Sequence, residues 1–245
     1  MSSERHEPSV RGYAVTHPPG RAELPIEPGW DQLLYTASGT MTVSTAVGSW
    51  TVPPRRALWV PDGAPVTVGN RFRVGVRSLY FAAALRALPP GPRAIEVTGF
   101  VRELLLHTVR ACPLDAAARV DHALLTVLLD QLHRLPAAPL WLPLPTEPRA
   151  ADAARLIAAD PAADLTRVAR AIGASRRTLE RAFAADTGLT LGAWRRRSRI
   201  LGALELLAAG TSVTETALAA GYSTPSAFVT AFRAELGRTP RDFLR

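Results

Sequence analysis

The sequence predicts a two-domain α+β chain in which a small β-barrel or sandwich, followed by helices, precedes an all-α C-terminal domain. Three observations point to this fold class. Residues 13–81 carry strand-like alternation cut by glycine and proline, residues 95–135 carry helical periodicity, and residues 165–240 contain one helical pattern twice. A proline-rich stretch separates the second region from the third, as expected of a domain boundary.

The N-terminal region alternates apolar and polar side chains over short stretches. Residues 40–44 alternate in this way, and in residues 71–77 the apolar side chains face one side and the arginines the other. Turn signals recur at Ser38-Gly39, Pro53-Pro54 and Pro61-Asp62-Gly63. Short strands at this spacing are typical of a small barrel or sandwich.

Two leucine-rich helices are expected between Ile95 and Leu135. Each has one apolar face, formed by Val101, Leu104, Leu105 and Val109 in the first and by Leu125, Leu128, Leu129 and Leu132 in the second. Such faces pack on the barrel, form part of a dimer interface, or do both. Five prolines between Leu135 and Pro148 then indicate an extended linker. We therefore expect domains at residues 1–135 and 149–245, joined by a linker at residues 136–148.

The C-terminal pattern is an internal repeat with the order of a helix-turn-helix. Residues 165–191 align with residues 213–240, and the second copy has one extra residue in its turn. In each copy a small residue (Ala169 or Ala217) precedes a glycine (Gly173 or Gly221) that favours a left-handed helix end. The second helix then begins at a hydroxyl cap, Ser175 in one copy and Thr224 before Pro225 in the other. Ser212 and Glu215 form a predicted capping box that opens the second copy.

Charge favours a polyanionic partner for this repeat. The chain has a net charge of +8, and all 29 of its basic residues are arginine. Between Arg167 and Arg199 nine arginines face only Glu180 and Asp186. Such a concentration is typical of a nucleic-acid-binding surface, although a solvated arginine face is the alternative.

Helical geometry separates base contacts from phosphate contacts. With the apolar positions turned inward, Arg176, Arg177, Glu180 and Arg181 of the first copy and Ser226 and Thr230 of the second face outward, where they can contact base edges. Residues 191–209 are expected to form one helix of about 28 Å, which can place the second helices of both copies about one DNA turn apart. Phosphate contacts are expected from Ser175, Arg195, Arg196, Arg197, Arg199, Thr224 and Arg233.

These motifs resemble the DNA-binding domain of the AraC/XylS family of bacterial transcription regulators. The matching residues are Ser175-Arg-Arg-Thr-Leu-Glu-Arg-Ala-Phe183, Gly188, Ala217-Leu-Ala-Ala-Gly-Tyr222, Ser226-Ala-Phe228, Phe232-Arg233, Gly237 and Thr239-Pro240. The resemblance implies base contacts at Arg177, Glu180, Arg181, Pro225, Ser226 and Thr230. Pro225 has no hydrogen-bonding side chain, which departs from the pattern.

The resemblance continues upstream to the cupin-type N-terminal domain of one AraC subgroup. It rests on Gln32-Leu-Leu-Tyr35, Ser38-Gly39, Gly48-Ser-Trp50, Val52-Pro-Pro54, Ala57-Leu-Trp59 and Pro61-Asp-Gly63. In such relatives the barrel senses a small molecule and the following helices often form a homodimer. Trp30, Tyr35, Trp50 and Trp59 either line an apolar ligand pocket or pack in the core.

No metal or cofactor is expected. The five histidines (6, 17, 107, 122 and 133) are dispersed, Val66 occupies a position where relatives often have histidine, and only His17 with Glu23 or Glu27 remains a possible grouping. Cys112 is the only cysteine, so an intramolecular disulfide is excluded and a reducing cytoplasm fits. It could serve as an alkyl acceptor or redox sensor, but no neighbouring motif supports that role. No apolar run reaches membrane-spanning length, and residues 1–10 lack the apolar core of a secretory signal.

The sequence therefore predicts a cytoplasmic, non-enzymatic regulator that binds promoter DNA and responds to a small molecule. An activator would also contact RNA polymerase. The alternative is a cupin-type enzyme or sensor with a nonspecific DNA-binding tail, but neither a nucleophile elbow nor paired catalytic carboxylates support catalysis.

Overall fold

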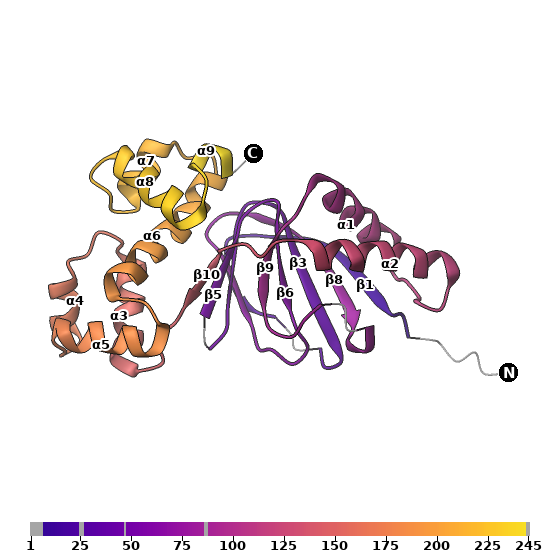
Figure 1. Ribbon diagram of the computed structural model, residues 1–245, viewed down its shortest axis with the longest axis horizontal. Helices are drawn as coiled ribbons and strands as arrows, with labels where there is room; N and C mark the ends of the chain where they lie inside the picture. Colours follow the sequence, from indigo (N-terminus) through magenta and orange to yellow (C-terminus); the bar gives the residue numbers. More distant parts are fainter. Residues whose placement is uncertain (1–6, 25–26, 47, 86–87, 244–245) are drawn as a thin grey trace. The chain divides into compact units, whose positions relative to one another are not determined.

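The computed structural model describes residues 7–24, 27–46, 48–85 and 88–243 (Figure 1). Its strands form two five-stranded sheets, and the C-terminal part is helical, which confirms the predicted α+β fold class. The chain divides into two compact units, residues 1–39 with 52–138 and residues 40–51 with 139–245. None of the described helices combines the length and apolar composition that a membrane span requires.

The first unit contains an antiparallel sheet with the strand order β1-β8-β3-β6-β9. These strands are β1 (Val10–His17), β8 (Val74–Ala82), β3 (Trp30–Ser38), β6 (Arg56–Val60) and β9 (Arg93–Glu96). A second antiparallel pair joins β2 (Gly20–Glu23) to β7 (Thr67–Asn70), and a 3₁₀ turn η1 (Ala83–Leu85) follows β8. Residues 71–73, which were expected in a strand, instead connect β7 to β8.

Two helices, α1 (Gly99–Ala111) and α2 (Arg119–Arg134), cover one face of this sheet (Figure 1). The Thr98 side chain caps α1 by accepting a hydrogen bond from Val101 N. Both leucine faces pack into one core cluster with Leu33, Tyr35, Trp59 and other buried side chains of the sheet. The faces predicted from periodicity are therefore used within the chain. Ile95, expected at the start of the helical region, lies in β9.

The second unit combines three strands with the C-terminal helices. The strands are β4 (Met41–Ser44), β5 (Gly48–Val52) and β10 (Trp141–Pro143), and β10 pairs with β5 in antiparallel register. The helices are α3 (Pro148–Ala159), α4 (Leu165–Ala171), α5 (Arg176–Thr187), α6 (Leu191–Ala208), α7 (Val213–Ala219), α8 (Pro225–Leu236) and α9 (Pro240–Phe243). The predicted long helix is thus present, with Ala209 as its C-cap.

The proline-rich segment makes specific contacts with the helices of the second unit. The indole nitrogen of Trp194 donates a buried hydrogen bond of 2.6 Å to Pro143 O. The Asp186 carboxylate accepts hydrogen bonds from Thr146 N, Thr146 Oγ1 and Glu147 N at 2.7, 3.0 and 2.8 Å. Glu147 in turn caps α3, and Pro148 occupies the first turn of that helix. Side chains of α5 and α6 therefore hold this segment in place.

We predict that Asp186→Ala loosens residues 146–147. The hydrogen bonds from Glu147 N and Thr146 N lower the pKa of Asp186, so the folded state favours the carboxylate. A lowered pKa means that this stabilisation is present above the ordinary Asp pKa of about 3.9 and is lost as the pH falls through the lowered value. The expected result is faster amide exchange at residues 146 and 147 at pH 7, with a melting-temperature difference from the wild type that shrinks toward pH 3.

Asp152→Ala is the matched control for this prediction. Asp152 lies on α3 and pairs with Arg155, whereas the Thr146 and Glu147 amides donate to Asp186. Equal exchange at residues 146 and 147 in wild type and Asp186→Ala would contradict the proposed restraint.

Candidate nucleic-acid interface

The structure contains both predicted helix-turn-helix units, α4 with α5 and α7 with α8. Each turn contains a glycine in the left-handed region, Gly173 with φ of 65° and Gly221 with φ of 77°. The Ser175 hydroxyl accepts a hydrogen bond of 3.0 Å from Thr178 N, and the Thr224 hydroxyl accepts one of 3.2 Å from Ala227 N. Both hydroxyl caps predicted from the sequence are therefore present.

The capping box at the start of α7 is also present. Ser212 accepts a hydrogen bond from Glu215 N, and the Glu215 carboxylate accepts one from Ser212 N. A further hydrogen bond from the Ser212 hydroxyl and this backbone bond lower the pKa of Glu215. The carboxylate is thus held in its charged form at the positive end of the helix dipole.

Buried side chains fix which face of each second helix points outward. Leu179 and Phe183 of α5 are buried, as are Phe228 and Phe232 of α8. Phe183 packs edge-on against Trp194 of α6, with ring centroids 5.1 Å apart. The residues predicted to contact bases all lie on the exposed remainder of these two helices: Arg176, Arg177, Glu180, Arg181, Ser226 and Thr230.

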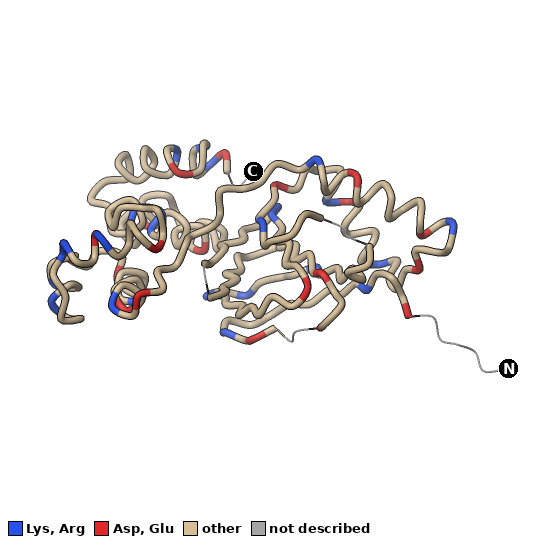
Figure 2. Tube along the Cα trace, turned by 60° about the horizontal axis from the view of Figure 1, so that its bottom comes forward, with Lys and Arg blue, Asp and Glu red and all other residues tan. Residues whose placement is uncertain are grey.

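The exposed face of α5 carries Arg176, Arg177 and Arg181 beside Glu180. Figure 2 marks the basic and acidic positions along the whole chain. Arg176 Nε lies 2.9 Å from Glu180 Oε1, so these two side chains form an ion pair along the helix. Within the described part of the chain, Arg177 and Arg181 have no acidic side chain at ion-pair distance. Arg177 and Arg181 are consequently the cations on this face that are available to an external anion.

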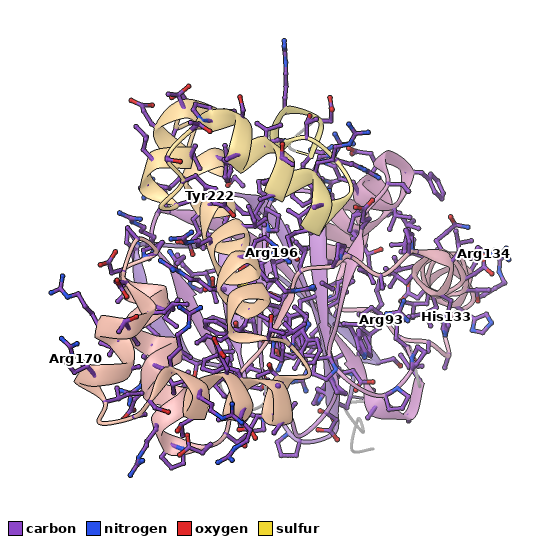
Figure 3. The ribbon with its side chains drawn as sticks, turned by 60° about the vertical axis from the view of Figure 1, so that its left-hand side comes forward. Arg93, His133, Arg134, Arg170, Arg196 and Tyr222 are labelled. Carbon is purple, nitrogen blue, oxygen red and sulfur yellow. The ribbon has the colours of Figure 1, made fainter. Side chains whose placement is uncertain are left out.

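The arginines at the start of α6 are engaged within the protein. Arg196, labelled in Figure 3, places its Nε 2.8 Å from Glu235 Oε1 of α8. Arg197 Nε donates a hydrogen bond of 2.7 Å to Trp141 O. Arg195 and Arg199 donate to backbone carbonyls in the loop between α3 and α4. Arg196 is the most exposed of the four. Their assignment to phosphates stays a prediction, as it does for Ser175, Thr224 and Arg233, which are exposed.

The four aromatic residues proposed for a ligand pocket have separate surroundings. Tyr35 and Trp59 belong to the core beneath α1 and α2, and the Arg11 guanidinium lies 4.0 Å from the ring centroid of Trp30. Trp50, in the second unit, stacks on Trp141 at 6.4 Å. These contacts account for their burial by packing, and their role in ligand binding stays a prediction.

Among the described residues, no cluster of three histidine, cysteine or acidic side chains is placed to hold a metal. His6 lies outside the described residues. Glu27, one member of the grouping left open with His17, is paired with Arg11 at 3.1 Å. Burial, and to a lesser degree Asp121, raises the pKa of Cys112 to about 11, so its thiol is protonated at neutral pH and is a poor nucleophile.

Sequence reasoning missed a surface pocket of about 260 Å³ on the second unit. Its lining residues come from α3, α4 and their connection: Leu156, Asp160, Ala163, Asp164, Arg167, Val168 and Ala171. Leu156 is exposed although it is apolar, and this combination becomes visible only once α3 is placed. No motif in the sequence marks the pocket.

Comparisons with known proteins agree with the duplicated motif. A helix-turn-helix domain family matches residues 168–245. The HTH-type transcriptional regulator NimR of Escherichia coli is 27% identical over 215 residues, which cover 87% of this chain and 79% of NimR. RipA of Corynebacterium glutamicum, also an HTH-type transcriptional regulator, is 36% identical over 103 residues, 41% of this chain and 31% of RipA.

Among solved structures, fatty-acid-bound ToxT of Vibrio cholerae is 12% identical, with a TM-score of 0.38 over 96% of this chain and 94% of that chain. The residues matched by the helix-turn-helix family run from within α4 to the C-terminus and so include α5, α7 and α8. Residues 168–245 therefore match a helix-turn-helix domain, and the chain is similar over most of its length to an HTH-type transcriptional regulator.

Proposed function

We propose that the protein recognises promoter DNA by inserting α5 and α8 into two successive major grooves. The observation that supports this most directly is that, in both helix-turn-helix units, the second helix buries one face and exposes a polar one. In the proposal, Arg176, Arg177, Glu180 and Arg181 contact bases from α5, and Ser226 and Thr230 contact bases from α8. Residues 149–245 form the DNA-binding part, with residues 1–135 as the sensor and 136–148 as the linker.

Exposure ranks the candidates for phosphate contact. Arg196, Arg233, Ser175 and Thr224 are exposed, so each can reach an anion without unfolding its surroundings. To bind a phosphate, Arg196 must give up its ion pair with Glu235, whose carboxylate still has Arg197 Nη1 at 3.8 Å. Arg197 is less exposed and donates to Trp141 O, so it is the weaker candidate.

A footprint on a selected DNA site tests this function. A site isolated from random-sequence DNA should show protection over two adjacent major-groove segments on one side of the duplex for each protomer. The two segments should differ in sequence, because α5 and α8 expose different side chains. Protection of a single groove segment per protomer would refute the two-groove arrangement.

Arg181→Ala and Arg196→Ala should weaken DNA binding in different ways. Loss of a bidentate arginine contact to a base should cost about 1–3 kcal/mol and relax preference at one base pair. Loss of a phosphate contact should weaken binding to all sequences and reduce the salt slope by about 0.9. Titrations of both variants on specific and random DNA, at several salt concentrations, separate these outcomes. Equal losses on both DNAs for Arg181→Ala would contradict its assignment to a base.

The N-terminal region is proposed to sense a small molecule, in line with its resemblance to cupin-type sensors. Because the similar proteins NimR and RipA are named transcriptional regulators, we propose that this protein acts by binding rather than by catalysis. An activating role would add RNA polymerase as a partner. Because promoter DNA of bacteria lies in the cytoplasm, we place the protein there.

Homodimerisation is proposed to use an exposed apolar stripe on α2. Val120 and Val127 are 69% and 45% exposed and lie seven residues apart, hence on one helix face. The leucine faces of α1 and α2 are covered by the sheet, so they contribute mainly to the core. A second copy that packs its own α2 against this stripe would bury both valines.

Val127→Asp should therefore shift the full-length protein toward the monomer. A carboxylate buried in an apolar contact without a partner is strongly unfavourable. Thr126→Asp is the matched control, since Thr126 is an exposed neighbour that points about 100° away around the helix. Sedimentation at tens of micromolar should show loss of dimer for Val127→Asp alone, and a monomeric wild type would end the proposal.

A further inference from the structure

Arg195 and Arg199 converge on the loop between α3 and α4. They lie four residues apart on α6 and therefore project from the same face. Arg199 Nε donates a hydrogen bond of 2.6 Å to Pro161 O, and Arg195 Nη2 donates one of 3.1 Å to the same oxygen. Arg195 also donates to Ala163 O. This loop leads directly into α4, the first helix of the first helix-turn-helix unit.

Arg199 also contacts the turn of the second unit. Its guanidinium carbon lies 5.5 Å from the ring centroid of Tyr222, the residue that follows Gly221. A Cβ built on Gly221 would lie 2.8 Å from Arg199 Nη2 and 2.9 Å from Pro161 O. Pro161, Arg199 and Gly221 are therefore in mutual close contact, and only glycine fits at the third position. One arginine of α6 thus touches both the loop that leads into the first helix-turn-helix unit and the turn of the second.

The environment of these arginines is unsuited to a phosphate contact. Both side chains are partly buried, and the Nε atom of Arg195 is fully enclosed. Burial, followed by the charge of Arg195, lowers the pKa of Arg199, as expected of a cation withdrawn from water beside a like charge. Arg195 Nη2 and Arg199 Nε already donate to carbonyl oxygens, so a phosphate at these atoms would have to displace bonds within the protein.

We propose that Arg199, assisted by Arg195, is a positioning residue that fixes the separation and orientation of α5 and α8. It thereby sets the spacing between the two base sequences that the protein accepts. The inference rests on the proposed two-groove binding. It differs from the sequence prediction, which placed both arginines on phosphates. Gly221 is the complementary partner, because any larger residue would push the second turn away from Arg199 and Pro161.

The test compares DNA sites with the selected spacing and with one base pair inserted between the two groove segments. Wild type should prefer the selected spacing by about tenfold or more, since an insertion both shifts and rotates one segment. Arg199→Gln and Gly221→Ala should each reduce that preference by roughly threefold or more, with a salt slope like that of wild type. A salt slope reduced by about 0.9, together with an unchanged spacing preference, would show that Arg199 binds phosphate and would overturn the inference.

Two matched variants control for charge and for backbone strain. Arg196→Ala removes an exposed arginine from the same helix and should alter the salt slope without altering the spacing preference. Gly173→Ala places a side chain at the equivalent position of the first unit, with a similar positive φ but no atom within 4 Å of the new Cβ. It should keep the spacing preference, whereas Gly221→Ala should lose it.

The outcomes also separate this inference from the proposed function. If wild type shows no spacing preference, the two-groove arrangement fails and the inference fails with it. If wild type has the preference and Gly221→Ala and Arg199→Gln retain it, only the inference fails. Thermal melting of each variant confirms folding. If Arg199→Gln does not fold, Gly221→Ala, which keeps both arginines, decides the question.

Discussion

The packing of α6 against both helix-turn-helix units is the constraint on which the DNA-binding part depends. This helix contacts α5 of the first helix-turn-helix unit, α7 and α8 of the second, and also α3. Its buried side chains include Trp194, Ile200 and Leu204, and burying each such side chain contributes about 1.5–3 kcal/mol. Because α6 packs in the cores of both helix-turn-helix units, displacement of either of these units would expose apolar surface. The separation of α5 and α8 is therefore a property of the packed core.

Polar contacts add direction to this apolar packing. Two arginines four residues apart on a helix repel by a few tenths of a kcal/mol, so their proximity requires compensation. Hydrogen bonds from charged donors, each of about 1.5–3 kcal/mol, provide it at Pro161 O and Ala163 O. Trp194 of α6 and Asp186 of α5 also form hydrogen bonds with the proline-rich segment. The arginines at the start of α6 thus contribute hydrogen bonds within the domain in addition to positive charge.

Local sequence signals predicted the C-terminal elements well because helix ends depend on neighbouring residues. The hydroxyls of Ser175 and Thr224 cap the helices that follow them, and the left-handed conformation that glycine favours occurs at Gly173 and Gly221. Alternation likewise predicted strands in the N-terminal region, except at residues 71–73, where a turn interrupts the pattern. The leucine faces of α1 and α2 were also correctly identified. Periodicity could not predict whether a sheet or another helix covers these faces, because a helix needs the same apolar stripe to pack against either.

The sequence by itself determined the duplicated motif, its caps, the inward faces of α5 and α8, and hence the class of protein. These features follow from residue types at short range, where backbone geometry leaves few alternatives. Only the tertiary structure decided which arginines remain available to DNA. Arg181 and Arg199 are the same residue type in the same basic stretch, yet one is exposed on α5 and the other lies between Pro161 and Tyr222. That difference arises from contacts across tens of residues, because a guanidinium binds whichever acceptor the fold brings to it.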